Sequence, residues 1–110
     1  MAKFEVRLMF EWGGPCLWGM NDAAKSAFGG YAGLENTLPL SEDIKAKLFE
    51  LIEIHDGALD WANPGGPSLW SKQEFDKFET EARSILEVIQ TELDDRFLVW
   101  YEPVGKAEER

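Results

Sequence analysis

Residues 71–93 read SKQEFDKFETEARSILEVIQTEL, and this stretch decides the fold. At its start, Ser71 and Glu74 have the spacing of a capping box, in which each side chain hydrogen-bonds the backbone amide of the other residue. Trp70 and Phe75 flank the cap at the positions of a hydrophobic staple. Apolar side chains then recur every three or four residues: Phe75, Phe78, Ala82, Ile85, Leu86, Ile89 and Leu93. The pattern predicts an amphipathic helix from about residue 72 to about 94.

A second amphipathic helix is predicted upstream of the first. Ser41 suits the N-cap position, and Glu42 and Asp43 place negative charge where the helix dipole favours it. Helical spacing relates Ile44, Leu48, Leu51, Ile52 and His55. This helix of about four turns is expected to end near residues 56–57. Residues 57–70 are dense in proline and glycine, which predicts a loop that packs on the body through its tryptophans.

Both ends of the chain have strand patterns. Residues 3–12 alternate, and their apolar side holds Phe4, Val6, Leu8, Phe10 and Trp12. This period of two predicts a half-buried strand, and Gly13-Gly14-Pro15 predicts a hairpin turn into residues 16–18. Residues 96–102 are rich in aromatic and β-branched side chains, which predicts a last strand paired with the first.

Together these elements predict a two-layer α+β domain over residues 1–104. Its small antiparallel sheet would combine the N-terminal hairpin with the C-terminal strand, because a sheet with one solvated face favours antiparallel pairing. Two long antiparallel helices would cover the apolar face of this sheet. A short helix from Asn21 or Asp22 through Phe28 is also expected, and the polar residues 105–110 are expected to fray.

Charge narrows the range of partners. The chain of 110 residues has 11 Lys and Arg against 21 Asp and Glu, a net charge of −10. This charge argues against direct binding to nucleic acid or to an anionic membrane, whose phosphates would repel it. Residues 42–60 carry six acidic and two basic side chains, and residues 72–96 carry eight and four. This charge either solvates the helices or forms a docking face for a basic protein.

The sequence also predicts a location. It shows neither the unbroken apolar stretch of a signal peptide nor a run approaching the roughly 20 apolar residues of a membrane span. Its single cysteine excludes an internal disulfide. We therefore expect a cytoplasmic protein.

The sequence contains few candidates for catalytic or metal-binding residues. His55, the only histidine, lies on the apolar stripe of its helix, and Cys16 lies in an apolar strand, so both are interpreted as core residues. Metal ligands are not clustered and the glycine pairs lack a phosphate-loop motif, so neither a metal nor a cofactor is expected. An enzyme is therefore not expected. A ligand-binding or catalytic pocket near His55, Asp60 and Trp61 is left open as the alternative.

Residues 4–18, 59–71 and 92–99 resemble stretches of the immunity proteins encoded beside bacterial polymorphic toxins, including contact-dependent growth-inhibition systems. The resemblance implies a small acidic protein that neutralises a toxin domain, often a basic nuclease. That family shares no catalytic residues, so the resemblance assigns no role to individual positions. With the charge pattern, it leads to a hypothetical partner-binding set of Glu50, Glu53, Asp56, Asp60, Trp61, Trp70, Glu79 and Glu87. A structural or oligomer-forming domain is the third alternative, and the oligomeric state is not predicted.

Overall fold

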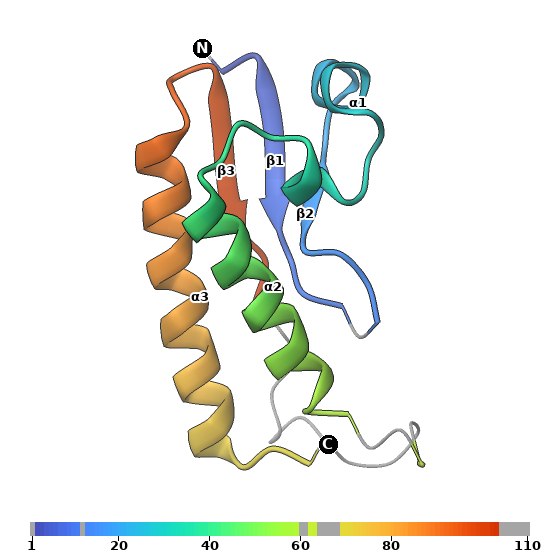
Figure 1. The fold of residues 1–110 in the computed structure, drawn as a ribbon, viewed down its shortest axis with the longest axis vertical. Helices are drawn as coiled ribbons and strands as arrows, with labels where there is room; N and C mark the ends of the chain where they lie inside the picture. The colour runs from blue at the N-terminus through green and yellow to red at the C-terminus, as the bar shows by residue number, and fades with distance from the viewer. Residues whose placement is uncertain (1, 12, 60–61, 64–68, 104–110) are drawn as a thin grey trace.

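The elements of the structure follow the predicted order (Figure 1). The structure is a computed structural model that describes residues 2–11, 13–59, 62–63 and 69–103. Its elements are β1 (Phe4–Leu8), β2 (Leu17–Gly19), α1 (Asp22–Phe28), the 3₁₀ helix η1 (Leu34–Asn36), α2 (Glu42–Asp56), α3 (Lys72–Glu92) and β3 (Phe97–Tyr101). The predicted α+β class is confirmed. The predicted tail at residues 105–110 lies outside the described residues, as do Trp12, Asp60 and Trp61.

The sheet is mixed, which corrects the prediction of an antiparallel sheet. Its strand order is β2-β1-β3, with β1 antiparallel to β2 and parallel to β3. The predicted hairpin is therefore confirmed, whereas the predicted direction of the last strand is wrong. In Figure 1, α2 runs in the direction of β1, α3 returns, and the short connection after α3 reverses the chain again. β3 consequently runs parallel to β1. The alternation of residues within β1 shows which face is buried, but it does not show the direction of a neighbouring strand.

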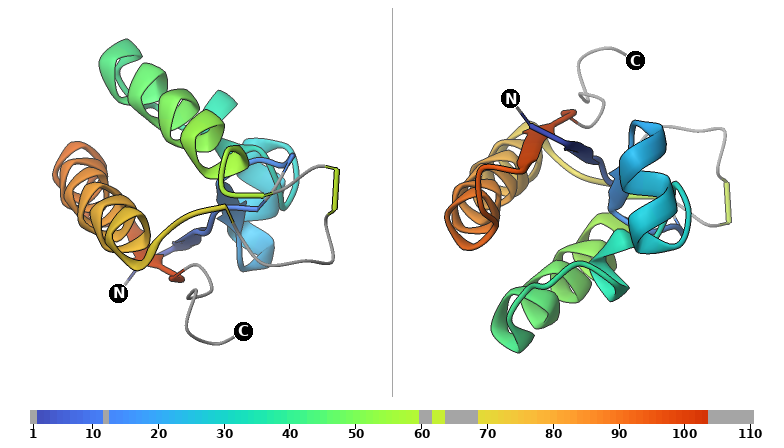
Figure 2. Two further views of the ribbon diagram at one scale, coloured as in Figure 1. Left: turned by 90° about the horizontal axis from the view of Figure 1, so that it is seen from below. Right: turned by 90° about the horizontal axis from the view of Figure 1, so that it is seen from above.

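The two long helices form a layer over one face of the sheet, as predicted (Figure 2). They are antiparallel, and the Ser41 amide at the start of α2 donates a hydrogen bond to the Glu92 carboxylate at the end of α3. The core between the layers contains Val6, Leu8, Leu48, Leu51, Phe78 and Ile89, all almost completely buried. Each such side chain contributes about 1.5–3 kcal/mol of hydrophobic stabilisation. The helical layer is therefore held on the sheet by its predicted apolar faces.

Side-chain caps set the starts of the helices. Ser71 Oγ accepts a hydrogen bond from the Glu74 amide at 3.2 Å, and Glu74 Oε1 accepts one from the Ser71 amide at 3.0 Å, so the predicted capping box is present. Ser41 Oγ accepts from the Ile44 amide at 3.3 Å. Asn21 caps α1, which confirms the short helix through Phe28. These local bonds fix where α2 and α3 begin, and hence which side chains line the space between them.

Candidate partner-binding groove

An aromatic cluster holds the C-terminal half of α2 against the start of α3. The Trp70 ring lies 5.1 Å from the Phe75 ring and 5.2 Å from the Phe78 ring, measured between centroids. The His55 ring lies 5.5 Å from that of Phe78 and 6.0 Å from that of Phe10. The contact between Trp70 and Phe75 is the predicted hydrophobic staple. Trp70 is therefore held against the body of the protein just before the N-terminal end of α3.

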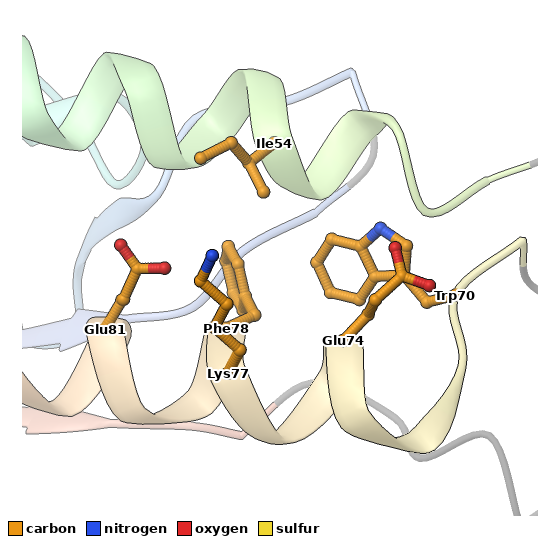
Figure 3. Close-up of a pocket in the computed structure, with 6 residues that line it drawn as sticks. All are labelled: Ile54, Trp70, Glu74, Lys77, Phe78 and Glu81. Carbon is orange, nitrogen blue, oxygen red and sulfur yellow. The ribbon is translucent and has the colours of Figure 1, made fainter.

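Beside this cluster, a hollow of about 300 Å³ opens between the two helices (Figure 3). We call it the inter-helix groove, and it is lined by Ile54, Trp70, Glu74, Lys77, Phe78 and Glu81. Figure 3 shows Ile54 reaching from α2 toward the α3 side chains. The groove thus combines an apolar floor with a charged rim, which is the usual composition of a surface that accepts a partner side chain.

One lysine links the two sides of the groove. Lys47 Nζ lies 3.1 Å from a Glu50 carboxylate oxygen on α2 and 3.3 Å from a Glu81 carboxylate oxygen on α3. These hydrogen bonds, first with Glu50 and then with Glu81, raise the pKa of Lys47. Because two carboxylates share one ammonium, the rim near Lys47 keeps a net negative charge.

The predicted acidic residues do not form one cluster. Glu50 is connected to the groove through Lys47, and Trp70 lines it. Asp56 instead accepts a hydrogen bond from the Gly13 amide at 2.8 Å, which ties the end of α2 to the hairpin loop. Glu79 accepts a hydrogen bond from the Tyr101 hydroxyl at 2.6 Å, on the side of α3 that faces β3.

The remaining predicted positions lie elsewhere. Glu53 and Glu87 are exposed and are not among the groove residues. Asp60 and Trp61 fall outside the described residues. Of the predicted residues, Trp70 therefore lines the groove and Glu50 is linked to it through Lys47.

Sequence reasoning missed as site residues all of the groove lining except Trp70, namely Ile54, Glu74, Lys77, Phe78 and Glu81, and it missed Lys47, which is linked to Glu81. A signal for them existed. Residues 74, 77 and 81 are spaced by three and four, so they share one flank of α3, and residues 47 and 54 are two turns apart on α2. Such flanking rows become a site only when the facing helix is known, because the groove needs both helices.

His55 and Cys16 both have the buried positions predicted for core residues. His55 is 3% exposed, and burial lowers its pKa to about 4 against smaller opposing effects of Asp56 and of a hydrogen bond with the Glu11 backbone. Burial, followed by the nearby Glu35 carboxylate, raises the pKa of the Cys16 thiol. Both side chains are thus neutral near pH 7, and neither lines the groove. Within the described ranges, no group of three or more potential metal ligands gathers.

The fold and the groove define a small α+β domain with a helical layer open to solvent. Its family is identified by the match of a family model described as Serratia CdiI immunity protein-like, which covers residues 4–104. The chain belongs to this family, and the resemblance found in the sequence is confirmed. No curated protein matches the chain significantly. Among the described residues, no helix has the length and apolar character needed to cross a bilayer.

Membership of this immunity family indicates a toxin-neutralising function and, in general terms, a protein toxin as the partner. Proteins of such a family are usually non-catalytic.

Proposed function

We propose that this chain neutralises a basic toxin domain by binding it across the helical layer of α2 and α3, and that it catalyses no reaction itself. The family match is the observation that carries the proposal. The charge pattern supports the basic partner, because residues 42–60 and 72–96 each carry a net charge of −4 (two minus six and four minus eight). Opposite charges accelerate the encounter of two proteins and favour the correct orientation.

The inter-helix groove would provide the anchor of this interface. Its apolar floor includes Phe78 and Trp70, which other rings hold in place, so little side-chain entropy is lost when a partner binds. Glu74 and Glu81 on the rim would attract a lysine or arginine whose aliphatic stem lies against Ile54. An aromatic anchor surrounded by charge is typical of the residues that dominate binding energies at interfaces.

The proposal is tested by titrating the purified chain with the toxin domain encoded beside it. We expect a stable one-to-one complex whose affinity falls steeply as the salt concentration rises from about 0.1 M to about 1 M, because the Debye length shrinks from about 10 Å to about 3 Å. Failure to form a complex at low salt would contradict the proposal.

A matched pair of variants locates the interface. Ile54 lines the groove and is 40% exposed, whereas Leu98 on β3 is 50% exposed and lies on the opposite face of the sheet. Both substitutions to lysine add one positive charge at an exposed apolar position. We expect Ile54→Lys to weaken toxin binding by at least about tenfold and Leu98→Lys to leave it within about twofold. The reverse pattern would place the toxin on the sheet and refute the helical interface.

A further inference from the structure

The face of the sheet that points away from α2 and α3, here called the outer face, carries an unusual row of side chains. Arg7 on the central strand is paired with Trp18 on β2 and with Trp100 on β3. Arg7 and Trp100 directly follow Val6 and Val99, which are buried beneath the helices. Successive side chains of a strand point to opposite faces, so Arg7, Trp100 and their register partner Trp18 share the outer face. Arg7 thus lies between two tryptophans in the strand register, on a sheet surface that neither long helix covers (Figure 2).

Apolar side chains extend this row. Leu98 is paired with Glu5 on the outer face, and Met20 follows Trp18 at the end of β2. Tyr31 packs on Trp18 with 5.8 Å between ring centroids and is 62% exposed. A hollow of about 380 Å³ on this face is lined by Arg7, Met9, Glu11, Trp18, Gly19, Met20, Lys25 and Tyr31. Exposed apolar groups gathered around a hollow are typical of an interaction surface.

Arg7 lacks a partner within the described part of the chain. Its Nε is buried and has no hydrogen-bond acceptor, and none of the ion pairs of the described residues includes it. A buried donor left without an acceptor is unfavourable, and a guanidinium binds a carboxylate in preference to other acceptors. A carboxylate from a partner would give this guanidinium an acceptor that the described residues do not supply.

We propose that the outer face binds the outer face of a second copy of this chain, forming a symmetric dimer in which Arg7 of each copy pairs with Glu5 or Glu11 of the other. The charge distribution favours this occupant. The acidic side chains that give the chain most of its negative charge lie in the helical segments, whereas the outer face holds basic Arg7 and Lys25 against Glu5 and Glu11. It is thus a face on which two copies of charge −10 can meet without strong repulsion.

The geometry of this arrangement keeps the acidic layers apart. Two sheets packed face to face stand about 10 Å apart, and each helical layer would lie beyond its own sheet. The separation of the acidic layers therefore exceeds the Debye length of about 8 Å at physiological ionic strength, so their repulsion is screened. In the same arrangement, the inter-helix groove of each copy stays open to solvent. The dimer therefore does not depend on the proposed toxin interface.

The test is the mass of the chain in solution, measured by sedimentation equilibrium over a concentration range up to about 100 μM, where a micromolar dimer is nearly saturated. We expect twice the monomer mass of 12.5 kDa. Leu98→Lys and Met20→Lys should each shift the chain to monomer, and Arg7→Met should weaken association at least about tenfold. Ile54→Lys, a matched change on the helical layer, should leave the dimer intact. Circular dichroism of each variant separates lost association from lost folding.

Several outcomes would overturn this proposal. One is a wild-type chain that stays monomeric over the whole range, and another is a dimer that Ile54→Lys disrupts and the outer-face variants do not. A monomer that dimerises only after deletion of residues 104–110 would assign the outer face to the chain's own end. A monomer whose toxin binding is lost in Leu98→Lys would assign it to the toxin. Toxin binding is measured separately, so a monomeric chain that still binds the toxin through the helical layer would overturn the dimer and leave the proposed function standing.

Discussion

Mild acid should destabilise this protein through His55. Burial among aromatic rings lowers the pKa of His55 to about 4, from about 6.5 in an exposed or unfolded chain. As the pH falls, the unfolded chain therefore binds a proton before the folded chain does, and the equilibrium shifts toward unfolding. The contribution of His55 to stability is complete above about pH 6.5 and is lost as the pH falls toward about 4.

The size of the effect follows from the shift in pKa. One pKa unit corresponds to about 1.4 kcal/mol, so the whole shift is worth about 3 kcal/mol. Relative to its value at pH 7, the free energy of unfolding should fall by about 1 kcal/mol at about pH 5.5 and by about 2 kcal/mol at about pH 5 because of His55. These conditions stay above the isoelectric point of about 4.5, where precipitation would interfere.

Urea denaturation followed by tryptophan fluorescence measures this loss, with His55→Phe as the reference. Phenylalanine keeps a ring against Phe78 and Trp70 but cannot bind a proton. Because the carboxylates titrate alike in both proteins, the difference between their unfolding free energies isolates His55. That difference should change by about 2 kcal/mol between about pH 7 and about pH 5, with the wild type losing more. A difference that stays constant with pH, or an NMR titration of His55 near its ordinary pKa, would refute the reasoning.

Three further substitutions test the packing and the caps by urea denaturation. Phe78→Ala should cost about 3–5 kcal/mol, because Phe78 is almost fully buried beneath the groove, and a loss below about 1 kcal/mol would contradict its central place. Ser71→Ala removes one side of the capping box and should cost about 1 kcal/mol, with Ser84→Ala, on the exposed surface of α3, as the neutral control. Gly29→Ala should cost about 1 kcal/mol through its positive φ of 87°, since the added Cβ meets no atom within 4 Å. An unchanged midpoint in Gly29→Ala would show that the turn relaxes freely.

Local signals in the sequence were sufficient for the elements but not for their assembly. The capping box at Ser71 and the three-to-four spacing after it predicted α3, which the structure places at Lys72–Glu92. The alternation around Val6 predicted β1 and its buried side. These signals are local because backbone hydrogen bonds and caps involve residues close in sequence. The direction of β3 is not local, since it depends on the path of the chain through both long helices.

The groove was predictable only in part for the same reason. Trp70 could be recognised from the staple it forms with Phe75, two positions that the cap relates directly. Glu81 gains its importance only from Lys47, which approaches from the other helix. Asp56 was expected on a docking face, yet it caps a loop residue 43 positions earlier in the chain. Acidic residues counted along a helix therefore indicate the charge of a layer without showing which of them are free to meet a partner.

The parallel pairing of β1 with β3 has a consequence for the order in which the sheet can form. Its register joins Phe4 to Phe97, two residues that lie far apart in the sequence. The hairpin and α1 can form from contacts close in sequence, whereas the other edge of β1 stays unpaired until β3 reaches it. Long-range pairing of this kind slows folding and leaves an exposed strand edge meanwhile. Loss of a few residues from β3 would therefore leave an unfinished sheet instead of a shortened protein.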